Sequence, residues 1–214
     1  MIKAAIFDMD GLLIDSEPLW EKSDTYFLKS QGYVYTPELR MKMVGRGQRE
    51  AIELLKKEFG FSSKEVNELI RERKKVFYEM FFKQVRLMEG VRELLERLGA
   101  KNLALAVATG GHSVKKTKEV LKSFNLCKHF SVLASSDQVE KGKPHPDVFL
   151  FTAKLLDVDP KYCLVLEDTV NGSLAGKAAG MKVFGVNKDK KIRKEIKECG
   201  VDGVFASLLE IKNI

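Results

Sequence analysis

The sequence predicts an α/β fold, in which a doubly wound parallel sheet forms the core and an all-helical domain is inserted into it. Short apolar runs rich in β-branched residues alternate with helical patterns, and these runs are 2–7, 103–108, 132–134, 163–166, 183–186 and 204–206. Continuous apolar strands separated by amphipathic helices are typical of a parallel sheet covered on both faces. Residues 15–82 contain no such strand pattern. We therefore predict a core of residues 1–14 and 83–214, and a helical cap domain of residues 15–82.

The helices of the core are indicated by apolar residues at helical spacing. One such stripe lies within residues 91–98 and another within residues 149–156. Gly99 is expected just past the end of the first helix, because glycine readily adopts the left-handed conformation found there. Pro146 is expected in the first turn of the second helix, where its missing N–H costs no hydrogen bond.

Four helices are predicted within residues 15–82. The first begins at Pro18 and ends near Gly32, and a short second helix follows. The third covers residues 48–59, and a capping box at residues 62–65 introduces the long fourth helix. Both crossings between the two domains fall beside the end of the first strand, so we expect the helical domain to act as a lid.

Composition and charge limit the classes of partner. The chain has 214 residues, a formal net charge of +7 and 31% charged residues, with basic and acidic side chains interspersed and no arginine-rich arm. This pattern favours a solvated charged surface over a nucleic-acid interface. No apolar run is long enough to cross a bilayer, and we expect no signal peptide before the first strand. Three cysteines without C-x-x-C spacing indicate free thiols, which are typical of the cytoplasm. Taken together, these observations lead us to expect a cytoplasmic protein without nucleic-acid or membrane partners, and we expect it to be a monomer.

Two carboxylates follow the first apolar run directly. Asp8 and Asp10 flank one residue and precede Gly11, at the sheet edge where ligands bind in open α/β folds. One carboxylate could attack an electrophile while the other moves a proton, and the pair could hold a hard cation such as Mg²⁺. A solvated acidic turn explains these residues equally well when they are considered alone.

Two later loops carry groups suited to phosphate. Thr109 and Gly110 follow the second strand and offer a hydroxyl and a backbone N–H before a helix. Lys143 precedes Pro144, which restricts the lysine to extended backbone and so places its side chain on a fixed platform.

Adjacent acids, Glu167 and Asp168, end a buried strand pattern. Two such carboxylates repel each other unless a cation compensates. Mg²⁺, Lys143 and a proton on one aspartate would make this edge receptive to a phosphate dianion. The histidines are not expected to be metal ligands, because their spacing makes no metal site; they are His112, His129 and His145.

The order of these motifs resembles the haloacid dehalogenase-like hydrolase superfamily, and the resemblance covers the whole chain. The helical insert is similar to the cap of its β-phosphoglucomutase-like branch, and the core would be Rossmann-like. The resemblance implies that Asp8 is the nucleophile that forms an aspartyl-phosphate. It also implies that Asp10 protonates the leaving oxygen and then activates water.

The same resemblance implies roles for the remaining core motifs. Thr109 and Lys143 would hold the transferring phosphoryl oxygens. Mg²⁺ would be bound by Asp8, by the backbone carbonyl of Asp10, and by Asp168 with Glu167 beside it. Positioning and charge stabilisation of this kind are nearly all that phosphoryl transfer requires.

Phosphatase and mutase activity remain the alternatives. Retention of Asp10 favours phosphoryl chemistry over dehalogenation, because a halide leaves without a proton. Sugar phosphomutases of this branch carry a histidine where Trp20 stands, so the resemblance favours a phosphatase acting on small phosphorylated substrates, foremost phosphorylated carbohydrates, over a β-phosphoglucomutase-type enzyme. Trp20, Arg49 and Lys74 are expected to contact the substrate, and residues 45–49 to reach over the pocket. A buried aromatic and solvated helix charges are the competing interpretations.

Overall fold

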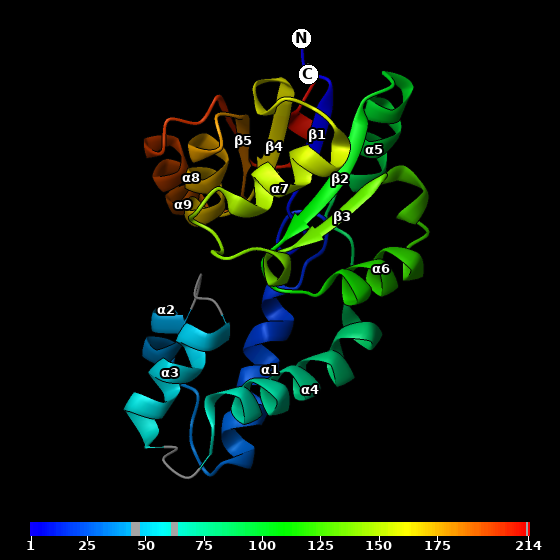
Figure 1. Cartoon of the computed structure of the whole chain (residues 1–214). Helices are drawn as coiled ribbons and strands as arrows, with labels where there is room; N and C mark the ends of the chain where they lie inside the picture. Colours follow the sequence, from blue (N-terminus) through cyan, green and yellow to red (C-terminus); the bar gives the residue numbers. More distant parts are fainter. Residues whose placement is uncertain (44–47, 61–63, 213) are drawn as a thin grey trace. The chain divides into compact units, whose positions relative to one another are not determined.

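The computed structural model divides the chain into two compact units (Figure 1). One unit comprises Met1–Ile14 and Leu87–Ile214, and the other comprises Asp15–Arg86. The residues that the structure describes are 1–43, 48–60, 64–212 and 214. Within these ranges no helix combines the length and the apolar character needed to cross a membrane.

The first unit contains a parallel sheet whose order is β3-β2-β1-β4-β5-β6. Its strands are β1 (Ala4–Phe7), β2 (Ala104–Thr109), β3 (Val132–Ser135), β4 (Cys163–Glu167), β5 (Lys182–Val186) and β6 (Gly203–Phe205). All neighbouring strands pair in parallel, which confirms the predicted doubly wound sheet. The chain runs outward from β1 to β3 and then returns to place β4 on the other side of β1. The carboxyl ends of β1 and β4 therefore form the switch point, where ligands bind in open sheets.

Helices lie on both faces of this sheet. They are α5 (Val91–Ala100), α6 (Val114–Ser123), α7 (Asp147–Leu156), α8 (Val170–Ala178) and α9 (Lys190–Glu198). Figure 1 shows α7 and α8 in front of the sheet and α5 behind it, as right-handed crossovers in two opposite directions require. Short 3₁₀ turns complete the unit, namely η1 (Cys127–His129), η2 (Ser136–Gln138), η3 (Pro160–Tyr162) and η4 (Leu208–Glu210).

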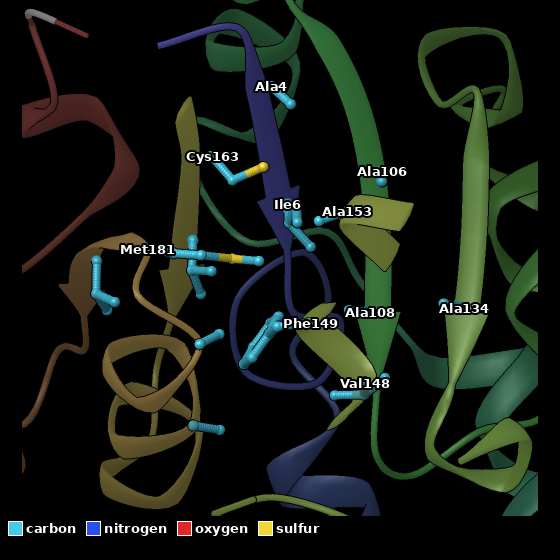
Figure 2. Close-up of a cluster of buried hydrophobic side chains, with 14 residues drawn as sticks. Ala4, Ile6, Ala106, Ala108, Ala134, Val148, Phe149, Ala153, Cys163 and Met181 are labelled. Carbon is cyan, nitrogen blue, oxygen red and sulfur yellow. The ribbon is translucent and has the colours of Figure 1, made fainter. Parts of the chain in front are cut away.

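The sheet and α7 enclose a hydrophobic core (Figure 2). Ile6 of β1 and Val148 and Phe149 of α7 are completely buried in it. Every residue of β1 and β4 is also buried, which explains why these strands are apolar without alternation. The two strands that end at the switch point are thus rigidly packed.

Two helix boundaries differ from the prediction. Gly99 lies inside α5, which continues to Ala100, and the residue with left-handed backbone is Asn102, with φ 56°. Asparagine takes this conformation because its short polar side chain tolerates it. Pro146 is the N-cap of α7 and not a residue of its first turn.

The second unit consists of four helices in its described residues. They are α1 (Glu17–Ser30), α2 (Pro37–Met43), α3 (Gln48–Phe59) and α4 (Val66–Gln84). A separate hydrophobic cluster, which includes Leu28, Ile52 and Leu69, holds them together. Glu65 is the N-cap of α4, so the expected capping box is wrong in its placement, and Ser62 lies outside the described residues.

The boundary of this unit also lies later than predicted. We expected it at residue 82, but α4 continues to Gln84. The Asp15 N–H then donates to the Arg86 carbonyl at 2.9 Å. This hydrogen bond joins the two ends of the insert and extends it to Arg86.

Candidate active site

The carboxyl ends of β1 and β4 bring two of the expected motifs together. Phe7 pairs with Leu166 across the two strands, and the Asp8 N–H donates to the Leu166 carbonyl at 3.0 Å. Asp8 therefore follows β1 at the level where Glu167 ends β4. Asp8 is only 7% exposed and Glu167 only 1%.

Lys143 connects these two carboxylates. Its Nζ donates to Asp8 Oδ1 at 2.5 Å, to Glu167 Oε1 at 2.6 Å and to the Ala108 carbonyl at 3.1 Å. These three bonds use every hydrogen of the ammonium group. Burial opposes a charge on Lys143, but Asp8 and Glu167 outweigh this effect and raise its pKa above the ordinary value. The lysine is thus fixed as a cation beside Asp8.

Glu167 holds both Lys143 and the beginning of α8. Its Oε2 accepts from the Asp168 N–H at 3.0 Å, from the Thr169 N–H at 3.0 Å and from the Thr169 hydroxyl at 2.9 Å. A Cβ on Gly172 would overlap the Glu167 carboxylate, so glycine is needed there. Both oxygens of Glu167 therefore have protein partners, with which direct binding of a metal would compete.

Asp168 is held differently. The Asn187 amide donates to its backbone carbonyl at 2.9 Å, and its carboxylate lies where a Cβ on Gly11 would be. Its Oδ1 is buried and has no hydrogen-bond partner in the described part of the chain. Burial, and after it the charges of Glu167 and Asp8, raise the pKa of Asp168 well above its usual range.

This orphaned oxygen fits a cation. Burial raises the pKa of Asp8 to about 7, with Glu167 and Asp10 adding to the effect and Lys143 opposing it. The ionised forms of Asp8 and Asp168 are thus disfavoured, and a bound divalent cation would compensate their negative charge. No group of three His, Cys, Asp or Glu side chains suited to a metal occurs among the described residues. The buried carboxylate oxygens of Asp8 and Asp168 are hard donors of the kind that Mg²⁺ prefers, and Mg²⁺ is commonly bound through one or two carboxylates while it keeps several waters.

The loop after β2 lies against Asp10. Thr109 is completely buried, and its Oγ1 accepts from the Gly111 N–H at 3.2 Å. A Cβ on Gly111 would lie 2.8 Å from Asp10 Oδ2. His112 Nε2 lies 3.0 Å from Asp10 Oδ1. Sequence reasoning did not assign His112 a role; its only signal was its place in the loop that carries Thr109.

The helical unit contains the three substrate contacts that we predicted outside the core motifs. Trp20 stacks on Phe77 with ring centroids 3.6 Å apart. Arg49 donates to Asn67 Oδ1 at 3.0 Å, and Lys74 lies half-buried on α4. Their contact with substrate stays a prediction. Residues 45–47 of the segment expected to reach over the pocket lie outside the described residues.

A buried ion pair in the same unit escaped sequence reasoning. Arg73 binds Asp24 through two hydrogen bonds of 2.6 and 2.9 Å, and it donates to Gln48 at 2.6 Å. Its guanidinium also lies 4.8 Å from the ring centre of Trp20. Arg73 is a charged residue among the buried residues of α4, which otherwise are apolar and include Leu69. A charged residue at helical spacing from apolar ones was the signal in the sequence that could have indicated this ion pair.

Comparison with known proteins gives consistent matches. A family model described as haloacid dehalogenase-like hydrolase matches residues 5–186. The chain is 34% identical over 203 residues to the phosphorylated carbohydrates phosphatase of Thermotoga maritima, covering 93% of the chain and 92% of that protein. It is 35% identical over 191 residues to hexitol phosphatase B of Escherichia coli K12, covering 85% and 82%.

A solved structure agrees in fold. A HAD hydrolase of family IA, variant 3, from Entamoeba histolytica superposes with a TM-score of 0.88. The superposition covers 99% of this chain and 96% of the other at 24% identity.

Proposed function

Because the chain belongs to the haloacid dehalogenase-like hydrolase family, we propose that it is a Mg²⁺-dependent phosphatase acting on phosphorylated carbohydrates through an aspartyl-phosphate. The observation that carries the proposal is the buried Asp8 carboxylate at the switch point, held by Lys143 at 2.5 Å. The named activities of the Thermotoga maritima and Escherichia coli relatives, both phosphatases, support the substrate class.

In the first half of the reaction, Asp8 attacks the phosphorus atom of the ester. The bond between phosphorus and the leaving oxygen breaks, and that oxygen takes the electron pair together with a proton from Asp10. Lys143 orients Asp8 through its bond to Oδ1, while Thr109 and the Gly110 N–H offer donors to the phosphoryl oxygens. Charge on those oxygens is thereby stabilised by donors that are already in place.

In the second half, a water molecule attacks the phosphorus atom of the aspartyl-phosphate. Asp10, now a carboxylate, accepts the proton of that water, and the bond from phosphorus to Asp8 breaks to release phosphate. Asp8, Asp168 and the backbone carbonyl of Asp10 would hold Mg²⁺, with Glu167 beside them. When bound, Mg²⁺ supplies the positive charge that this group of carboxylates lacks.

Phosphate release from purified protein tests the proposal. The substrates are p-nitrophenyl phosphate, a panel of sugar phosphates and a hexitol phosphate, each with Mg²⁺ and with excess EDTA. Asp8→Asn should abolish release because an amide is a poor nucleophile, whereas Asp157→Asn, an exposed matched control at the end of α7, should remain active. No Mg²⁺-dependent release from any substrate would refute the proposal.

A further inference from the structure

The imidazole of His112 is completely buried in the loop between β2 and α6. Its side chain is 0% exposed, whereas that of Asp10, its partner at 3.0 Å, is 24% exposed. Buried polar atoms are nearly always paired. Here the partner of Nε2 is the carboxylate that the proposed function makes the general acid and base.

The backbone of His112 is itself held in place. The Ser135 hydroxyl, at the end of β3, donates to the His112 carbonyl at 2.7 Å. Ser135 is anchored in turn, because its Oγ accepts from the Asp137 N–H and its own N–H donates to Gln138. The position of the imidazole is therefore set by the end of a buried strand.

Gly111 leaves room for the other oxygen of Asp10. A Cβ at position 111 would lie 2.8 Å from Asp10 Oδ2, closer than real contacts allow. Oδ1 of the carboxylate is thus hydrogen-bonded to His112, and Oδ2 lies in space that a side chain at position 111 would fill. The hydrogen bond to His112 therefore needs the small residue that precedes it in the loop.

We infer that His112 is a positioning residue that orients the Asp10 carboxyl group toward the leaving oxygen. The inference rests on the proposed function. As the bond to the leaving oxygen breaks, Asp10 gives up its proton and becomes a carboxylate, and the Nε2–H of His112 donates to Oδ1. A misplacement of a reacting group by about 1 Å can cost about 100-fold in rate, so loss of this contact should impair proton transfer selectively.

The test compares two kinds of leaving group in His112→Ala, His112→Gln and, as a matched control, His129→Ala. An alkyl phosphate, such as a sugar phosphate that the wild type hydrolyses, releases a basic oxygen that needs a proton. In p-nitrophenyl phosphate the leaving group departs as a stable anion. We expect kcat/KM for the alkyl ester to fall roughly 10- to 100-fold in His112→Ala, with a much smaller loss for p-nitrophenyl phosphate.

The ratio of the two kcat/KM values is the decisive quantity. Partial unfolding would lower both kcat/KM values by the same factor, and this factor cancels in the ratio. Glutamine carries an amide nitrogen that can replace Nε2, so His112→Gln should restore most of the ratio, and His129→Ala should leave it unchanged. If His112→Ala kept the wild-type ratio, because both esters lost kcat/KM equally or not at all, the inference would be overturned and the proposed function would remain intact.

A second measurement does not depend on turnover. In ¹⁵N-labelled protein, Asp10→Asn should shift the side-chain resonance of His112 and leave that of His129 in place. An unshifted His112 resonance would overturn the contact itself. Absence of hydrolysis by the wild type would instead refute the proposed function, and with it any role in proton transfer.

Discussion

Replacing Asp8 by Asn should remove a pH-dependent loss of stability from the metal-free protein. Burial first, and then the neighbouring carboxylates, raise the pKa of Asp8 from 3.8 to about 7 in spite of Lys143. Between these two values the folded protein binds a proton that the unfolded chain has lost. The free energy of unfolding therefore falls as the pH rises from about 4 to about 7, and the slope disappears above the folded pKa.

The magnitude follows from the size of the shift. One pKa unit corresponds to about 1.4 kcal/mol, so the two units between pH 5 and the folded pKa of about 7 amount to roughly 3 kcal/mol. Asparagine at position 8 does not titrate and can still accept a hydrogen bond from Lys143. Asp8→Asn should thus gain roughly 3 kcal/mol relative to the wild type when the pH is raised from 5 to 8.

Urea unfolding followed by far-UV circular dichroism, in EDTA at both pH values, measures this difference. Asp157→Asn is the matched control, because Asp157 is exposed with φ 54° and asparagine tolerates that conformation. Adding Mg²⁺ at pH 8 should stabilise the wild type more than Asp8→Asn. If the wild type and Asp8→Asn differed by the same free energy at both pH values, the electrostatic reasoning would be wrong.

Three further predictions concern the helical unit. Arg73→Met or Asp24→Asn should each lower the free energy of unfolding by about 3–5 kcal/mol, because each leaves a buried charge unpaired. The double variant should lose less than the sum of the two single losses. Additive losses, measured by urea unfolding, would contradict the pairing. Arg49→Ala and Lys74→Ala should raise KM for sugar phosphates more than for p-nitrophenyl phosphate, which lacks the distal groups; equal changes in steady-state KM would remove both residues from the substrate site. With Trp20 where mutases carry histidine, β-glucose 1-phosphate and a trace of the bisphosphate should yield free phosphate and little glucose 6-phosphate; efficient interconversion in a coupled assay would favour the mutase.

The strands and the core motifs were predictable because their signals are local. A parallel strand that is buried on both faces is apolar throughout. Asp8 stands out because it directly follows such a run, and Glu167 stands out because it ends one. The parallel order then places both at one edge without further information. The family resemblance implied the catalytic roles, which the four residues at positions 8–11 could not supply alone and which stay predictions.

The features that escaped prediction depend on partners far away in the chain. His112 is 102 residues from Asp10 and Arg73 is 49 residues from Asp24, so neither contact has a local pattern. The boundary at Arg86 likewise depends on a hydrogen bond to Asp15. Such pairings are decided by tertiary packing. In the sequence, a polar residue among apolar ones is the only sign of them.

The charge balance of the site links its parts. Asp8, Glu167 and Asp168 are three carboxylates around Lys143. The lysine bonds two of them, and Asp168 Oδ1 has no hydrogen-bond partner among the residues that the structure describes. An approaching phosphate dianion would meet excess negative charge, and in a buried site this repulsion is weakly screened. A divalent cation and the ester should therefore each favour binding of the other, because each carries the charge that the other requires. By linkage the two effects are equal, so the dissociation constant of Mg²⁺ should fall in the presence of ester by the same factor as that of the ester in the presence of Mg²⁺.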